Sequence, residues 1–260
     1  MQSQTIDQSR EMEEKNWWDL WNTSYRAQDS VDPTSTELFA HVADLIQKIS
    51  SGSKPRLLEV ACGTGTLSRT LGFSTYHGLD LSAAAVEIAR QKAALLPLPE
   101  GAAPATYEAA DFLDWPLPKE PFDVVLFVDA IACIRDQQVV LEKIARSLDV
   151  NGHLVLTTVN PFVYNRIRRA GGVRLENGPV SHYLKRSELH ALVKRAGLKM
   201  ERSFSIMPRG NMGILRFVNA RRLNDLCGVR GADILRRLKE MAGLGQYNVV
   251  VARKSGSSRH

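Results

Sequence analysis

The chain has 260 residues, 44% of them hydrophobic and 24% charged, which is the composition of a globular protein and excludes a disordered chain or a coiled coil. No apolar run reaches the ~18 residues that a membrane-spanning helix needs. The net charge of +6 is unevenly distributed, because residues 1–150 hold 13 Lys and Arg against 22 Asp and Glu, a net −9, whereas residues 151–260 hold 21 against 6, a net +15.

The first residues (MQSQTIDQSREMEEK) are polar and acidic, and they resemble neither a secretory signal nor an Arg-rich transit peptide. The three cysteines, Cys62, Cys133 and Cys227, are odd in number and lack CxxC spacing. This pattern favours a reducing compartment and disfavours a zinc or iron–sulfur site. We therefore expect a cytoplasmic protein without a bound metal.

From residue 56 onward, short apolar runs alternate with helical periods, which is the pattern of an α/β fold. Segment 122–128 (FDVVLFV) is apolar on both faces, as expected for a central strand of a parallel sheet. Ser82 and Ser187 stand at cap positions in front of predicted helices. The predicted strands are 56–61, 75–79, 105–110, 122–128, 152–159, 198–207 and 246–253, and the predicted helices are 65–72, 83–95, 136–148 and the segment from Ser187 to Gly197.

Two segments, 162–186 and 209–244, are too long for simple connections. Additions to an open α/β sheet gather over the carboxyl ends of the strands, where ligands bind, so we expect both segments to face substrate. Both are rich in arginine, and the second predicts a basic amphipathic helix whose apolar side either packs on the domain or recognises an anionic or lipid-linked acceptor. Its apolar positions at helical spacing are Leu215, Val218, Leu223 and Leu226.

The segment LLEVACGTGT (57–66) carries the strongest signal for a ligand site. A strand ends there in an acid, passes through a glycine turn that lets the backbone approach a ligand, and opens a helix whose free N–H groups suit an anion. The dinucleotide fingerprint G-x-G-x-x-G fails, because Ser68 occupies its last position, and no P-loop Gly-Lys-Ser/Thr follows. Acids also mark the next strands, with Asp80 and Asp111 at strand ends and Asp123 leading into the fourth strand.

The four ordered segments LLEVACGTGTLS, GLDLS, AADF and FDVVLFVDAI, over about residues 56–135, resemble the class I S-adenosylmethionine-dependent methyltransferases. The resemblance implies a Rossmann-like, mostly parallel seven-stranded sheet with helices on both faces, an antiparallel last strand and helical additions over the carboxyl edge. It implies a single domain over residues 1–260 with a lid helix in 1–30. It also implies S-adenosyl-L-methionine as the methyl donor and S-adenosyl-L-homocysteine as the product.

The resemblance further implies roles at the methionine end of the donor. Glu59 and the backbone at Ala61, Gly63 and Gly65 would hold the methionine portion, although Ala61 stands where the family usually has glycine. In similar enzymes an N-terminal aromatic helix folds over the donor, and Tyr25 and Arg26 would reach the donor's carboxylate from there. A purely structural role for Glu59, and for the tryptophans of this helix, is the alternative.

At the adenosine end, Asp80 would accept hydrogen bonds from both ribose hydroxyls, and Leu81 would lie against the adenine. Asp111 would bind the adenine amino group, and the backbone N–H of Phe112 its ring nitrogen. Asp129 is a further cofactor-binding candidate, with a structural role left open. Asp80 and Asp111 could instead flank or cap helices.

The expected reaction is methyl transfer to a small-molecule acceptor, with a hydroxyl of an anionic or lipid-like compound favoured and N- or C-methylation still possible. Hydroxyl acceptors usually need a general base, and His182 is the best-placed histidine, with a local structural role as the alternative. Cys133 stands where many relatives have histidine, so no role of that histidine transfers.

Two other functions remain open. A nucleic-acid methyltransferase could use the basic half as its footprint, but the Asp/Asn-Pro-Pro-aromatic motif is missing after the fourth strand, where Val128-Asp129-Ala130-Ile131 stands. A non-catalytic protein that binds the donor is the third interpretation. Peripheral membrane contact is also possible, and the sequence identifies neither the acceptor nor the oligomeric state.

Overall fold

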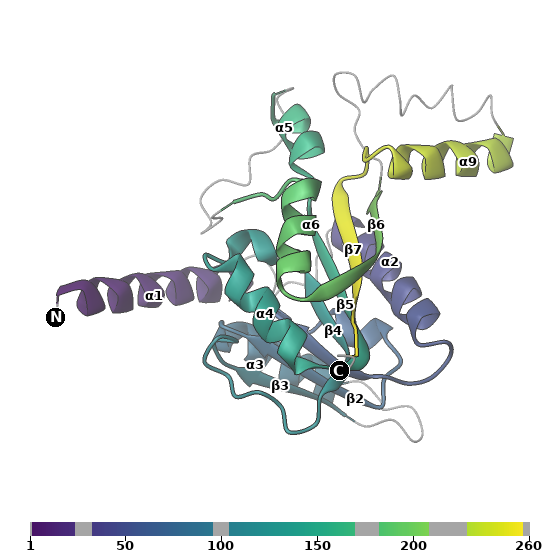
Figure 1. The fold of residues 1–260 in the computed structure, drawn as a ribbon. Helices are drawn as coiled ribbons and strands as arrows, with labels where there is room; N and C mark the ends of the chain where they lie inside the picture. Colours follow the sequence, from purple (N-terminus) through teal and green to yellow (C-terminus); the bar gives the residue numbers. More distant parts are fainter. Residues whose placement is uncertain (1, 24–32, 96–103, 170–181, 208–227, 257–260) are drawn as a thin grey trace.

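The computed structural model contains a seven-stranded sheet with the strand order β3-β2-β1-β4-β5-β7-β6 (Figure 1). Neighbouring strands are parallel from β3 through β5, whereas β7 is antiparallel to both β5 and β6. The predicted mostly parallel sheet with an antiparallel last strand is therefore confirmed. The structure describes all residues except 1, 24–32, 96–103, 170–181, 208–227 and 257–260.

The seven strands follow one another in the order that the sequence predicts, whereas the helices over residues 33–49 and 161–169 were not predicted. The strands are β1 (Arg56–Val60), β2 (Thr75–Asp80), β3 (Ala105–Ala109), β4 (Phe122–Val128), β5 (Leu148–Val159), β6 (Leu198–Ile206) and β7 (Tyr247–Lys254). The helices are α1 (Gln2–Trp21), α2 (Pro33–Ile49), α3 (Ala83–Ala94), α4 (Gln137–Ser147), α5 (Pro161–Arg169), α6 (Arg186–Arg195) and α9 (Gly228–Met241), with short 3-10 turns η2 (Leu67–Thr70) and η3 (Ile131–Cys133).

Hydrophobic cores lie on both faces of the sheet, because successive strand residues point to opposite sides. In β1, Leu58 belongs to the core under α4 and α6, and its neighbour Leu57 belongs to the core under α2 and α3. Both leucines are fully buried. Helices therefore cover both faces of the sheet. The edge formed by the carboxyl ends of the parallel strands is then the place where a binding site can form.

Two of the predicted helices differ from the structure, one in type and length and the other in its first residue. The predicted helix 65–72 is a single 3-10 turn, η2, because Gly65 lies in the left-handed region and Leu71 is already extended. Helix α6 begins at Arg186, one residue before the predicted cap Ser187, because the Glu188 carboxylate accepts the Lys185 backbone N–H at 2.7 Å. Ser82, in contrast, caps α3 as predicted, accepting a hydrogen bond from the Ala85 N–H at 3.0 Å.

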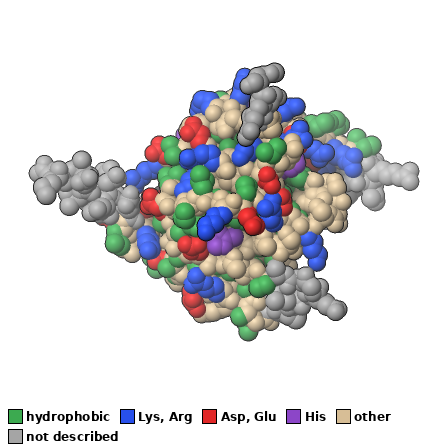
Figure 2. Space-filling model, turned by 60° about the horizontal axis from the view of Figure 1, so that its bottom comes forward, with side chains coloured by type: hydrophobic (Ala, Val, Ile, Leu, Met, Phe, Trp, Pro, Cys, Tyr) green, Lys and Arg blue, Asp and Glu red, His purple; other side chains and the backbone are tan. Residues whose placement is uncertain are grey.

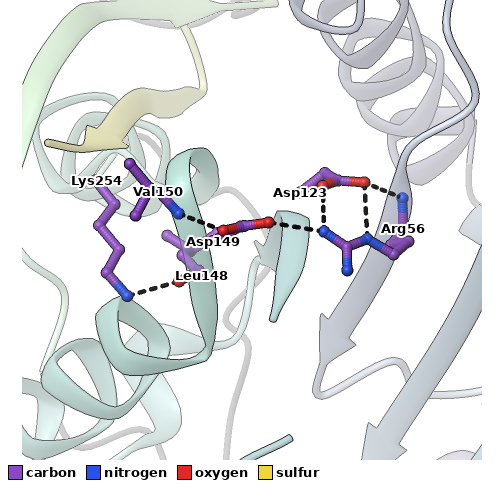
Figure 3. Close-up of polar contacts among 6 residues, drawn as sticks. All are labelled: Arg56, Asp123, Leu148, Asp149, Val150 and Lys254. Atoms are coloured by element: carbon purple, nitrogen blue, oxygen red, sulfur yellow. Dashed lines mark hydrogen bonds and ion pairs between the residues drawn. The ribbon is translucent and has the colours of Figure 1, made fainter. Parts of the chain in front are cut away.

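An ion-pair cluster ties the amino ends of the parallel strands together (Figure 3). The Arg56 guanidinium at the start of β1 contacts Asp123 at 2.7 Å and Asp149 at 2.8 Å, which belong to β4 and β5. Arg56 holds the pKa of the Asp123 carboxyl below its usual range through this hydrogen bond. Because the groups are partly exposed, the cluster contributes modestly to stability. It gives Asp123 a structural role at the edge away from the candidate site.

The surface shown in Figure 2 carries Lys and Arg interspersed with Asp and Glu, so the charge difference between the two halves of the sequence does not produce one basic face there. Among the described residues, no helix combines the length and apolarity needed to cross a membrane. The same residues include no group of three or more His, Cys, Asp or Glu side chains suited to a metal ion.

Candidate functional site

A cavity of about 200 Å³ lies at the carboxyl ends of β1, β2 and β4. Its polar wall consists of carboxylates and the glycine turn after β1, and its apolar wall comes from α1, α2 and the turns after the strands. Glu59, Ala61, Gly63, Asp80, Leu81 and Asp129 all line it, so the structure brings together six of the residues that the sequence singles out. The other lining residues are Glu14, Trp18, Trp21, Asn22, Leu38, Phe39, Cys62, Thr64, Thr66, Leu67, Val128, Ala130, Cys133 and Ile134.

Sharp turns at two strand ends present the backbone to this cavity. Ala61, directly after β1, has a φ of 58°, and Asp129, directly after β4, has a φ of 55°. Left-handed backbone at non-glycine residues is strained and concentrates at functional sites. Gly63 has a φ of +53° and leaves open space where a Cβ would stand. The turn thus offers a bare backbone surface to a ligand, which is the feature that the glycine pattern predicts.

Asp80, at the end of β2, holds the glycine turn in place. One of its carboxylate oxygens accepts the Gly63 backbone N–H at 2.7 Å, and the other accepts the Ser82 N–H at 2.9 Å. Burial raises the pKa of the Asp80 carboxyl, while these two N–H groups act in the opposite direction. Both oxygens keep further lone pairs for a ligand, since a carboxylate accepts up to about four hydrogen bonds.

Glu59 is fully enclosed beneath the turn, with 3% of its surface exposed. The Tyr76 hydroxyl donates a hydrogen bond to its carboxyl group. The pKa of Glu59 is raised to about 8, chiefly by burial; the Tyr76 hydrogen bond acts in the opposite direction, and the nearby Asp80 adds a smaller upward contribution. Glu59 therefore carries a proton near neutral pH, and a cationic ligand in the cavity would favour its ionised form.

This raised pKa predicts a pH-dependent stability. Folding favours the protonated form of Glu59, so its contribution to stability is full below the unfolded pKa of about 4.5 and is lost as the pH rises toward 8. The free energy of unfolding of the wild type should fall across this range, relative to Glu59→Gln, by on the order of a few kcal/mol. Urea denaturation of both proteins between these pH values measures the difference. Parallel pH profiles would contradict the assignment.

Helix α1 covers one side of the cavity. Asp19 accepts hydrogen bonds from the Ser82 hydroxyl at 2.5 Å and the Ala84 N–H at 3.2 Å, which fixes α1 to the start of α3. Glu14 contacts Arg135 at 3.4 Å and fixes α1 to the segment after η3. Neither acid was predicted from the sequence as a site residue, although Glu14 lies one helical turn before Trp18, and such spacing marks a shared face.

A second group of residues lies near the cavity, since Asp129 and Cys133, which line it, both act electrostatically on Tyr183. Cys133 lines the cavity, and burial raises the pKa of its thiol to about 12, so it remains protonated near neutral pH. The rings of Tyr164 and Tyr183 pack 5.0 Å apart. Burial, with a smaller contribution from Tyr164, raises the pKa of Tyr183 above its usual range. The Tyr183 hydroxyl therefore stays protonated and can donate a hydrogen bond.

Several predicted site residues do not line the cavity. Asp111 is exposed and accepts the Leu113 backbone N–H at 2.7 Å, which corresponds to the capping alternative, and the Phe112 ring is buried in the core. The side chain of His182 is 60% exposed and lies 3.5 Å from Glu188. Gly65 packs against β3 and α3, beneath the turn. Tyr25 and Arg26 lie outside the described residues.

The cavity suits the donor that the resemblance implies. S-adenosylmethionine combines a sulfonium and an ammonium with a ribose diol, and the Asp80 carboxylate matches such cationic and hydroxyl groups. Its adenine ring needs an apolar wall, which Leu81 and Trp21 help to form. Gly63 lines this cavity, and a Cβ there would meet no protein atom within 4 Å. No lysine or arginine belongs to the lining within the described part of the chain, so a cation for the donor's carboxylate would have to come from elsewhere.

Comparison with known families identifies the fold. Residues 35–203 match the model of a family described as a methyltransferase domain. The N-methyltransferase NodS from Bradyrhizobium japonicum, solved with S-adenosylhomocysteine, superposes with a TM-score of 0.57 at 14% identity, over 89% of this chain and 92% of that chain. At this level of identity the structural likeness shows the fold alone.

Curated relatives include methyltransferases of mycobacteria. The chain is 35% identical to phthiotriol/phenolphthiotriol dimycocerosates methyltransferase 2 of Mycobacterium ulcerans over 113 residues, which are 42% of this chain and 41% of that protein. It is 26% identical to the Mycobacterium tuberculosis phthiotriol/phenolphthiotriol dimycocerosates methyltransferase over 196 residues, 74% of this chain and 67% of that protein. The chain thus spans between about two fifths and two thirds of the length of these relatives.

Proposed function

The chain belongs to the class I S-adenosylmethionine-dependent methyltransferases, and from this premise we propose that it methylates a hydroxyl group of a lipid-like small molecule. The observation that carries the proposal is the cavity, which places carboxylates and a bare glycine turn opposite an aromatic and aliphatic wall. The mycobacterial relatives, whose names specify dimycocerosates of phthiotriol as acceptors, support a lipid acceptor with hydroxyl groups.

When bound, S-adenosylmethionine supplies an electrophilic methyl group on its sulfonium. The protein contributes position and exclusion of water, which are the main requirements of an in-line displacement. Glu59 and Asp80, with the turn between them, would fix the donor, and α1 would shield it through Trp18 and Trp21. The protonated Tyr183 hydroxyl, beside the Tyr164 ring, is suited to donate a hydrogen bond to the acceptor oxygen.

The proton of the acceptor hydroxyl needs a destination as the new C–O bond forms. Asp129 lines the cavity at the end of β4, whereas the His182 side chain points toward Glu188 at the surface. We therefore assign the role of general base to Asp129 and not to His182, because a base must lie within reach of the proton that it accepts.

Two variants separate these candidates. Asp129→Asn should lower kcat by about 100-fold or more, because general-base catalysis typically contributes 10²–10⁴-fold, and it should leave S-adenosylhomocysteine affinity within a few-fold of wild type. His182→Ala should retain wild-type kcat. The measurement is steady-state transfer with an identified acceptor, together with calorimetry. Loss of turnover in His182→Ala with full turnover in Asp129→Asn would restore His182 as the base.

Transfer of a labelled methyl group tests the proposed acceptor class. Each reaction contains the protein, methyl-labelled S-adenosylmethionine and one class of acceptor. The acceptor classes are long-chain diols and triols, soluble phenols, amines, and RNA. We expect label in the organic-extractable product of the long-chain alcohols, stable to mild alkali because a methyl ether resists the hydrolysis that cleaves a methyl ester. Asp80→Ala serves as the inactive control. Label in RNA, or in amines alone, would contradict the proposal.

Charge reversal in α5 tests the predicted anionic character of the acceptor. The cavity lining that the structure describes is acidic, and the side chains of Arg168 and Arg169 in α5 lie outside the described ones. A KM that stays unchanged when Arg168 and Arg169 are both replaced by glutamate would exclude their role in binding an anionic group.

A further inference from the structure

Three apolar side chains of helix α9 are exposed to solvent. Ile234, Leu238 and Met241 are 60%, 52% and 65% exposed. Their spacing of four and three residues places them on one stripe of the helix. A surface helix normally packs such a stripe against the core, so contiguous large apolar side chains in solvent mark an interaction surface.

The orientation of α9 is fixed by contacts at its carboxyl end. The Ser205 hydroxyl donates to the Glu240 carbonyl oxygen at 2.8 Å, and the Asn160 side-chain amide donates to the carbonyl oxygens of Gly243 and Gly245, both at 2.8 Å. Lys239, on the side opposite the stripe, is buried. The helix is thus held with its apolar face outward, at the edge of the sheet where β5 and β6 end (Figure 1).

Cationic groups accompany the apolar stripe. Arg237 is exposed and, by helical geometry, lies on the same face as Ile234, Leu238 and Met241. Glu240, the acid in the last turn of α9, contacts Arg236 at 3.6 Å and is largely covered. The outer face therefore presents apolar groups with positive charge, a combination that characterises helices lying in the interface of anionic membranes.

We propose that the outer face of α9, formed by Ile234, Arg237, Leu238 and Met241, seats the protein on an anionic lipid surface. A second copy of the chain fits this face less well. A two-fold contact would bring the Arg237 guanidinium groups toward each other, and one helical stripe supplies little of the ~800 Å² per partner that a stable dimer buries. Anionic phospholipid headgroups, in contrast, supply a negatively charged partner for Arg237, which such a dimer would not provide.

This placement has a consequence for the site, although the proposal does not depend on the identity of the acceptor. The cavity and α9 both lie at the carboxyl edge of the sheet. A protein seated through α9 would therefore present this edge to the lipid phase. Acceptors dissolved in the membrane would then be at high local concentration beside the cavity.

Vesicle sedimentation with the full-length chain tests the proposal independently of methyl transfer. The probes are phosphatidylcholine vesicles and phosphatidylcholine vesicles containing phosphatidylglycerol, at low and high salt. The variants are the triple change Ile234→Ser, Leu238→Ser and Met241→Ser, and the single change Arg237→Glu. Matched controls are Val150→Ser, an exposed apolar residue at the opposite edge of the sheet, and Lys119→Glu in an exposed loop.

We expect wild type to bind the anionic vesicles in a salt-sensitive manner, the triple variant to bind about tenfold or more weakly, and Arg237→Glu about fivefold more weakly. The two controls should bind as wild type does, and thermal unfolding should show that every variant is folded. Binding that is equal on neutral vesicles, or unchanged in the triple variant, would overturn the proposal. A concentration-dependent dimer that the triple variant abolishes would overturn it as well, in favour of a second copy.

Discussion

Replacing Asp80 with alanine is expected to weaken S-adenosylhomocysteine binding by about 100-fold or more, the largest effect of any single change in the cavity. The carboxylate lines the cavity and also holds the glycine turn through the N–H groups of Gly63 and Ser82. Alanine removes the proposed acceptor for the ribose hydroxyls and leaves the Gly63 N–H without this partner. Calorimetric titration of the purified variant measures the loss.

A matched control separates loss of the site from loss of the fold. Asp123→Ala removes an aspartate at the opposite edge of the same sheet, where it pairs with Arg56. This control should cost some stability but leave the dissociation constant within about twofold of wild type, because additivity holds between distant sites. Asp80→Ala with near-wild-type affinity would show that the donor binds elsewhere.

The second large effect is expected at Gly65. A Cβ there would stand 2.9 Å from both the Ala89 Cβ and the ring of Tyr107, and the residue has a φ of +69°. Both neighbours are buried in the core between α3 and β3, so neither can move freely. Gly65→Ala should therefore lower the free energy of unfolding by about 3 kcal/mol, the sum of overpacking and left-handed strain. Urea denaturation measures this loss.

Gly63→Ala provides the contrasting case. The backbone is similarly left-handed, with a φ of +53°, but no atom lies within 4 Å of the added Cβ. Stability should fall by only about 1 kcal/mol, while donor affinity should fall because the methyl group enters the cavity. Equal losses of stability at the two glycines, with donor affinity retained in Gly63→Ala, would contradict the structure of this turn.

The succession of strands along the chain and the polar edge of the site could be predicted from the sequence because both depend on local patterns. Apolar strands that end in an acid or a glycine turn place Glu59, Gly63 and Asp80 at one edge of a parallel sheet, and these residues do line the cavity. Ser82 was likewise predictable, since a cap depends on its immediate neighbours. Local patterns did not fix the start of α6. Ser187 is a typical N-cap residue, but the Glu188 carboxylate accepts the Lys185 backbone N–H and the helix begins one residue earlier.

The rest of the site depends on contacts between distant segments. Asp19 and Glu14 reach the site because α1 packs against α3 and η3, and no spacing in the sequence gives that arrangement. Asp111 fits the motif, but its side chain caps its own turn in this structure. His182 follows the expected position along the chain, yet its side chain is directed to Glu188. Side-chain direction is set by packing, which the motif does not contain.

Calorimetric titration of the wild-type protein with S-adenosylhomocysteine tests the central claim most directly, with tryptophan fluorescence recorded in parallel. Trp18 and Trp21 line the cavity, so a ligand that binds there must change their surroundings. The account predicts one site per chain, micromolar affinity and a change in tryptophan emission at the same ligand concentration. A folded protein that shows no binding, or binding without any change in emission, would contradict a donor site between the glycine turn and α1.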